Sequence, residues 1–136
     1  MNYWLVKSEP DAFSWDQQMA NGVEPWTGVR NHMAKNNLKA MQTGDLAFFY
    51  HSNIGKEIVG IVKIVKPAYP DPTAEAGDWV CVDMQAATPL PRPVTLATIK
   101  ADPRLSDLAL VRLSRLSVAP VSAAHWKILC ELGGMT

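Results

Sequence analysis

Residues 46–65 read LAFFYHSNIGKEIVGIVKIV, two apolar runs separated by a short polar loop. The first run covers residues 46–50 and the second residues 58–65, and both are rich in the aromatic and β-branched residues that favour buried strands. Two such runs joined by a short loop predict a β-hairpin. Gly60 lies inside the second run and predicts a bulge or a close approach to the backbone.

The segments before this hairpin carry helix-capping signals. Residues 2–6 predict an opening strand, and Ser14 with Gln17 three residues later forms a capping-box pattern for a short helix. Asn31 can cap a second helix, which has apolar residues at helical spacing and ends before Gly44.

Prolines mark the segments after the hairpin. Residues 66–78 and residues 88–93 contain three prolines each. Because proline cannot donate a hydrogen bond to a sheet, we expect an exposed loop in the first segment and an irregular connector in the second. Residues 79–84 alternate in polarity and predict a strand between them.

The last third of the chain predicts short helices and one strand. Thr95 and Ser122 can each cap a helix, and Gly133 ends the second of these. Another short helix is expected over residues 106–113. Residues 116–121 predict a strand, and the proline within it indicates an edge position.

Composition limits the class of protein. Short strands with small helices between them predict a single α+β domain over residues 1–136, a compact and partly open β-barrel with helices around it. The mean hydropathy is −0.04 and no apolar run approaches the roughly 20 residues that a membrane span requires. The start of the chain has no apolar leader, so we expect a cytoplasmic protein whose Cys81 and Cys130 are free thiols.

The charge balance constrains any binding to nucleic acid. Lys and Arg together number 13, as do Asp and Glu. The chain therefore lacks the positive field that drives tight, sequence-independent binding to a phosphate backbone. Affinity for nucleic acid would have to come from a local site.

Polar and aromatic residues cluster at the ends of predicted elements, where a scaffold usually presents binding groups. A flat heterocycle with polar edges needs aromatic faces together with fixed donors and acceptors. The clusters supply all three types of group. The candidate binding residues are Lys7, Ser8, Glu9, Trp26, Arg30, Asn31, Tyr50, His51, Ser52, Tyr69 and Asp71.

Several motifs of this chain resemble those of the EVE domain family. They are YWLVKSEP (residues 3–10), WTGVRN (26–31), AKNNL (34–38), FYHS (49–52), YPDPT (69–73) and RLSVAP (115–120). The resemblance implies a PUA-like fold, a small mixed β-barrel surrounded by short helices. It also implies a role in recognising modified nucleobases in DNA or RNA. It does not imply catalysis, and we expect no cofactor and no metal. One departure is that residues 74–78 form a shorter loop than is common in the family.

The resemblance leads to a hypothesis on mechanism, in which one nucleotide leaves its strand and its base inserts into a pocket. We expect Trp26 and Tyr50 to form the pocket walls, and Glu9 to accept a hydrogen bond from an exocyclic amine such as that of cytosine. Lys7 and Arg30 would hold the flanking phosphates. The Watson–Crick edge would be read by Asn31, Ser8 and Ser52. These residues must then converge in one cavity.

Simpler roles exist for some of these residues. Lys7 and Glu9 could form a surface ion pair of little energetic value, and Asn31 could serve only as a helix cap. His51 has no second histidine at ligand spacing, so a metal site is not expected there. Core packing is expected for Trp4, Trp15, Trp79 and Trp126.

Two other classes of function compete with base recognition. One is an enzyme or binder that acts on a free nucleoside-like molecule, with His51 as base and Ser52, Glu9 or Asp71 as its partner. The other is a module that binds a peptide on an aromatic patch. The sequence contains no nucleophile elbow, phosphate-binding glycine loop or dinucleotide fingerprint, which favours a binding module over an enzyme.

Overall fold

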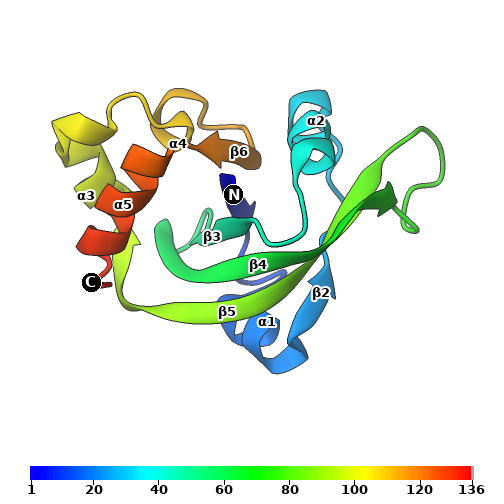
Figure 1. Cartoon of the computed structure of the whole chain (residues 1–136), viewed down its shortest axis with the longest axis horizontal. Coiled ribbons are helices and arrows are strands. Elements are labelled where there is room, and N and C mark those ends of the chain that lie inside the picture. The colour runs from blue at the N-terminus through cyan, green and yellow to red at the C-terminus, as the bar shows by residue number, and fades with distance from the viewer. Residues whose placement is uncertain (136) are drawn as a thin grey trace.

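The computed structural model describes residues 1–135 and contains one mixed six-stranded sheet with short helices on both faces (Figure 1). The strands are β1 (Tyr3–Ser8), β2 (Val23–Pro25), β3 (Leu46–His51), β4 (Glu57–Pro70), β5 (Val80–Thr95) and β6 (Val118–Val121). The helices are α1 (Trp15–Asn21), α2 (His32–Ala40), α3 (Leu96–Ala101), the 3₁₀ helix η1 (Pro103–Leu105), α4 (Ala109–Arg112) and α5 (Ala123–Leu132).

The strand order is β2-β5-β4-β3-β1-β6, and within residues 1–135 only β1 and β3 pair in parallel. The α+β class is therefore confirmed. The expected barrel is not closed, because β2 and β6 are the two outer strands and do not pair with each other among the described residues. The sheet is strongly curved, but its edges remain open (Figure 1).

The hairpin predicted from residues 46–65 is confirmed as β3 and β4. Their register shifts between Phe49 and Tyr50, where Val59 has no partner between Gly60 and Ile58. A Cβ atom at Gly60 would overlap the indole ring of Trp15. Both features expected of Gly60, a bulge and a close approach, are therefore present.

The expectation that prolines interrupt the sheet is wrong. β4 continues to Pro70, and β5 includes all three prolines of residues 88–93. The prolines of β4 are tolerated because Lys63 is the last residue of β4 that pairs with β3, so the rest of β4 has a neighbour on one side only. Those of β5 lie beyond Gln85, where the pairing of β5 with β2 ends, and among the described strands this part of β5 pairs with β4 alone. The pairing of β4 with β5 also contains several register shifts. The three-residue strand β2 was missed.

The predicted helix caps are confirmed. Ser14 and Gln17 form a complete capping box at α1, and the side chain of Asn31 accepts a hydrogen bond from the backbone N–H of Ala34 in α2. Thr95 and Ser122 cap α3 and α5 in the same way. The helix expected over residues 106–113 is shorter, since α4 has only four residues.

Two hydrophobic clusters cover the two faces of the sheet, and β3 contributes to both by alternation. Phe49 packs on the face covered by α1 and α2, whereas Phe48 packs on the face covered by α3, η1, α4 and α5. As expected, Trp4, Trp15 and Trp126 are buried in these clusters. Trp79 is only half-buried, and its ring stacks on that of His32 with the centroids 5.0 Å apart.

Both cysteines are free thiols, as expected: Cys81 is buried in β5 and Cys130 is half-buried in α5. No helix within residues 1–135 is long and apolar enough to span a bilayer.

Candidate nucleic-acid interface

A hollow of about 480 Å³ lies between the end of β1 and the segment that follows β2. We call it the first hollow. Its lining comes from segments far apart in the sequence, which the sheet brings together. The lining residues are Lys7, Ser8, Glu9, Ala12, Phe13, Glu24, Pro25, Trp26, Thr27, Gly28, Val29, Arg30 and Ser117.

Trp26 anchors one wall of the first hollow. Its backbone N–H donates to the carbonyl of Val82 at 2.7 Å, and its ring meets Phe49 and Phe13 edge to face, with centroids 5.6 and 6.1 Å apart. Only 8% of Trp26 is exposed. The ring is therefore held rigidly by the core and presents a small part of its surface to the hollow.

The end of β1 forms the facing wall. The hydroxyl of Ser8 donates to the carbonyl of Phe13 at 2.6 Å, and Glu9 is exposed and accepts a hydrogen bond from Asn53 at 2.7 Å. The ammonium of Lys7 donates to the carbonyl of Ser114 at 2.7 Å, and burial lowers the pKa of Lys7. Lys7 and Glu9 thus have separate partners and form no ion pair within residues 1–135.

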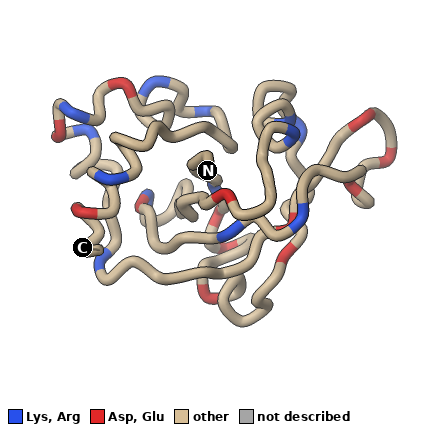
Figure 2. The backbone as a smooth tube through the Cα atoms, viewed as in Figure 1, with Lys and Arg blue, Asp and Glu red and all other residues tan. Residues whose placement is uncertain are grey.

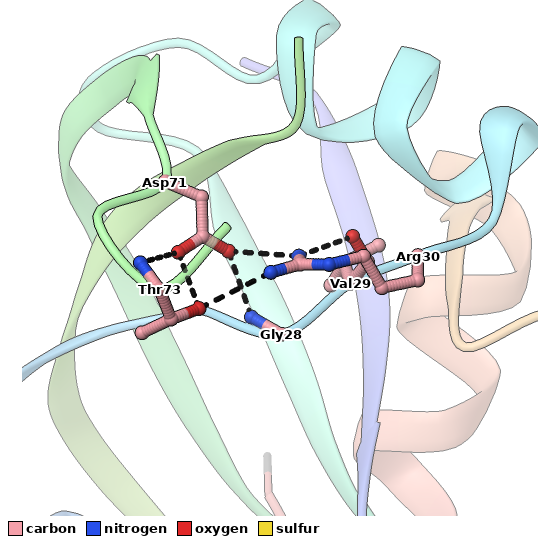
Figure 3. Close-up of polar contacts among 5 residues, drawn as sticks. All are labelled: Gly28, Val29, Arg30, Asp71 and Thr73. Atoms are coloured by element: carbon pink, nitrogen blue, oxygen red, sulfur yellow. Dashed lines mark hydrogen bonds and ion pairs between the residues drawn. The ribbon is translucent and has the colours of Figure 1, made fainter. Parts of the chain in front are cut away.

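A buried aspartate fixes the loop that carries Arg30 (Figure 3). One oxygen of Asp71 accepts hydrogen bonds from the backbone N–H of Gly28 at 2.9 Å and from Arg30 at 3.0 Å. The other accepts from the N–H and the hydroxyl of Thr73, both at 2.7 Å. Gly28 has a φ of +84°, a conformation that glycine adopts without strain. These hydrogen bonds hold residues 26–30 against the end of β4.

The carboxyl of Asp71 is ionised in this setting. Burial alone would raise its pKa, but the hydrogen bonds from Thr73, Gly28 and Arg30 outweigh burial and hold the pKa well below its usual range. Asp71 is fully buried, so it supports the wall of the hollow from behind and does not line it.

Arg30 combines this support with access to solvent. Its side chain is 38% exposed and lines the first hollow. Its guanidinium donates to Val29, Asp71 and Thr73, which uses three of its five N–H groups. The remaining donors can meet an anion at the mouth of the hollow.

Several candidate residues lie outside the first hollow. Tyr50 is 3% exposed and packs on the opposite face of the sheet, so its expected role as a pocket wall is wrong. β3 alternates, and a one-residue offset from Phe49 places Tyr50 in the other cluster. Burial also raises the pKa of Tyr50. Asn31 lines a separate hollow and caps α2.

The other three candidates that lie outside the first hollow make structural contacts. The ring of His51 accepts a hydrogen bond from the backbone N–H of Trp15 at 3.1 Å, and burial lowers the pKa of His51. The N–H of Ser52 donates to the carbonyl of Ser8 at 2.9 Å, and the hydroxyl of Tyr69 donates to Asp83. The expectation that Trp26, Asn31, Tyr50 and Ser52 share one cavity is therefore wrong.

The structure adds lining residues that the sequence did not reveal as such. Phe13 directly precedes the N-cap of α1, and Thr27 lies inside the WTGVRN motif. Ser117 is brought to Lys7 by the pairing of β1 with β6, and its carbonyl accepts the Lys7 N–H at 2.9 Å. The RLSVAP motif was a signal for Ser117, but only the strand pairing locates it. No group of three potential metal ligands occurs in the described part of the chain.

Comparison with known proteins gives consistent results. A family model described as EVE domain matches residues 2–132. Mouse thymocyte nuclear protein 1 is 34% identical over an alignment that covers 96% of this chain and 73% of the mouse protein. That alignment spans 165 positions, more than the 136 residues present here, so the mouse protein carries additional residues within the matched region.

Solved structures also match. A protein of Rhodopseudomonas palustris has a TM-score of 0.94 at 61% identity, covering 98% of this chain and 94% of that protein. Human THYN1 protein, crystallised in complex with DNA containing 5-methylcytosine, has a TM-score of 0.92 at 31% identity, covering 100% of this chain and 99% of the human chain. These matches confirm the PUA-like α+β fold.

Proposed function

Because the chain belongs to the EVE domain family, we propose that it is a non-enzymatic reader that binds one modified nucleobase of a DNA or RNA strand in the first hollow. The observation that carries this proposal is the hollow itself, which combines a rigid aromatic wall with polar groups along its sides and rim. Its volume of about 480 Å³ falls within the range of about 300–1,000 Å³ that is usual for small-ligand sites.

The lining provides the groups that a base requires. The exposed part of Trp26 and the half-buried ring of Phe13 supply apolar surface for the base and for a methyl-sized substituent. Such a substituent adds on the order of 1 kcal/mol, a modest preference over the unmodified base. Glu9 would accept a hydrogen bond from an exocyclic amine, and Thr27 belongs to the same lining.

Insertion of the base requires that the nucleotide leave its stack, which costs a few kcal/mol and must be offset by contacts in the pocket. Single strands lower this cost. Arg30 would contact the phosphate beside the inserted base, since its guanidinium is already oriented by Asp71 and Thr73. The human relative crystallised with DNA containing 5-methylcytosine supports the same class of ligand for this chain.

The test is a set of binding titrations by fluorescence anisotropy. Single-stranded and double-stranded DNA and RNA, with and without 5-methylcytosine, are compared with the parent chain and with Glu9→Ala. We expect Glu9→Ala to weaken binding of the modified strand roughly tenfold, because one hydrogen bond to a charged acceptor is lost. Asp11→Ala is the matched control, because Asp11 is also exposed but does not line the hollow.

Two results would contradict the proposal. Equal affinity of Glu9→Ala and the parent for every modified strand would show that the first hollow does not read the base. Formation of a new product from a modified nucleoside or oligonucleotide, detected by mass spectrometry, would show that the protein is an enzyme.

A further inference from the structure

A second hollow of about 300 Å³ lies beside the first, where α2 begins. Its lining residues are Asn31, Met33, Leu113, Ser114, Arg115 and Leu116. We call it the second hollow. Base recognition in the first hollow does not use these residues.

The two hollows adjoin along two segments of chain. Arg30 and Ser117 line the first hollow. Their neighbours in the chain, Asn31 and Leu116, line the second. Lys7, which lines the first hollow, donates its ammonium to the carbonyl of Ser114 in the second at 2.7 Å. The two hollows are therefore neighbours on the surface of the protein.

The second hollow presents apolar surface and a cation together. Met33 is 54% exposed and Leu113 is 47% exposed, although both are large apolar side chains. Arg115 is exposed and takes part in no ion pair within residues 1–135. Apolar side chains suit the face of an unstacked base, and a guanidinium suits a phosphate.

The walls of the second hollow are fixed before any ligand binds. The N–H of Leu116 donates to the carbonyl of Leu113 at 2.9 Å and closes a turn. Asn37 of α2 donates to the carbonyl of Val118 at 2.7 Å, and this bond ties the helix to β6. Preformed walls reduce the entropy that binding must overcome.

We propose that the second hollow binds the nucleotide next to the inserted base on the same strand. Met33 and Leu113 contact its base, and Arg115 contacts its phosphate. This inference rests on the proposed function of the first hollow. Because the contacts to the base are apolar, they accept any of the bases, and the second hollow adds affinity without strong sequence preference.

The experiment compares two ligands by isothermal titration calorimetry on the intact chain: 5-methyl-deoxycytidine monophosphate and a trinucleotide with 5-methylcytosine between two thymidines. The parent should bind the trinucleotide roughly tenfold more tightly than the mononucleotide. Met33→Ala, Leu113→Ala and Arg115→Ala should each lose about three- to tenfold of affinity for the trinucleotide. Their affinity for the mononucleotide should stay within about twofold of the parent.

Matched controls come from exposed residues outside both hollows. Met19 is 43% exposed on α1, and Met19→Ala should bind both ligands as the parent does. Arg112 is exposed at the end of α4 and pairs with Asp107, and Arg112→Ala should retain the trinucleotide affinity. Both controls test whether any loss of apolar surface or positive charge would have the same effect.

Three results would overturn the inference, and they differ from one another. If the mononucleotide binds but the three variants retain full affinity for the trinucleotide, the second hollow is not a nucleotide site, while the first hollow stands. If the variants lose affinity for both ligands equally, their residues only support the first hollow. If neither ligand binds the parent, the proposed function fails and this inference fails with it.

Discussion

Asp71 supports the shape of the first hollow through its hydrogen bonds. It lies outside the hollow but accepts hydrogen bonds from Gly28, Arg30 and Thr73, and so it holds the loop that forms one wall. The YPDPT motif suggested a residue in contact with the base. The structure assigns Asp71 a supporting position, which a motif without coordinates cannot distinguish from direct contact.

Replacement of this carboxylate should be costly. We expect Asp71→Asn to lower the free energy of unfolding by about 2–3 kcal/mol, because the buried acceptor of several hydrogen bonds loses its charge. Urea unfolding followed by tryptophan fluorescence measures this change. Asp107→Asn is the control, since Asp107 is exposed and pairs with exposed Arg112. An equal effect of the two variants would contradict this role of Asp71.

The same residue predicts a pH dependence of stability. The folded protein holds the pKa of Asp71 well below its usual range, so its contribution is complete above the ordinary carboxyl pKa of about 3.9 and is lost as the pH falls further. The free energy of unfolding of the parent should therefore fall more steeply below about pH 4 than that of Asp71→Asn. Parallel curves for the two proteins over the same pH range would contradict the assignment.

Trp26 belongs to the hydrophobic core as well as to the lining of the first hollow. Its position in a loop suggests an exposed ring, but the structure packs it against Phe13 and Phe49 with 8% exposed. We expect Trp26→Ala to lower the free energy of unfolding by about 3–5 kcal/mol, as for other buried aromatic residues. Thermal unfolding checks this, and a loss below about 1 kcal/mol would show that the ring is not part of the core.

Individual elements show what local sequence can and cannot specify. The caps at Ser14 and Asn31 were predictable because capping depends on a side chain and the N–H groups of the next turn. The extension of β4 past Lys63 was not predictable, because it depends on which side of the strand is left without a neighbour. A proline is excluded from the centre of a sheet but not from such an edge.

A substitution at the cap of α2 tests helix stability apart from base recognition. Asn31→Ala should lower the free energy of unfolding by about 1 kcal/mol, because the N–H of Ala34 loses its acceptor. Binding of the modified mononucleotide should not change, because Asn31 does not line the first hollow. A large loss of mononucleotide affinity in a folded Asn31→Ala protein, measured by calorimetry, would restore Asn31 as a base-reading residue.

The contact between α1 and β4 gives a second test of how the elements pack. Gly60→Ala should lower the free energy of unfolding by about 1–3 kcal/mol, because the added methyl group overlaps the ring of Trp15. The cost should be smaller when Trp15 is already replaced by Phe, whose ring is smaller. Additive effects in this double-mutant cycle would contradict direct contact.

The whole molecule has balanced charge, with 13 basic and 13 acidic residues, and Figure 2 shows both kinds spread along the backbone. We therefore expect a shallow dependence of affinity on salt for the modified single strand. We take Lys7, Arg30 and Arg115 as the phosphate contacts. A plot of the logarithm of the association constant against the logarithm of the salt concentration should then have a slope of about −2. A slope near −6 would indicate many more phosphate contacts.

The lining of the first hollow was predictable in part from the sequence. Motifs identified both walls of the first hollow, residues 7–9 and residues 26–30, because each wall is a continuous segment. They could not show that Tyr50 faces away or that Ser117 completes the lining. Both facts depend on how strands pair and on which face of the sheet a side chain occupies.

The most direct test of base recognition is an amide nitrogen–proton NMR titration with a single strand containing 5-methylcytosine. The indole N–H of Trp26 and the backbone N–H groups of Ser8 and Thr27 should shift on binding, because these residues line the first hollow. The indole N–H of Trp126, on the opposite face of the sheet, should not move. Shifts at Trp126 with Trp26, Ser8 and Thr27 unchanged would contradict the account.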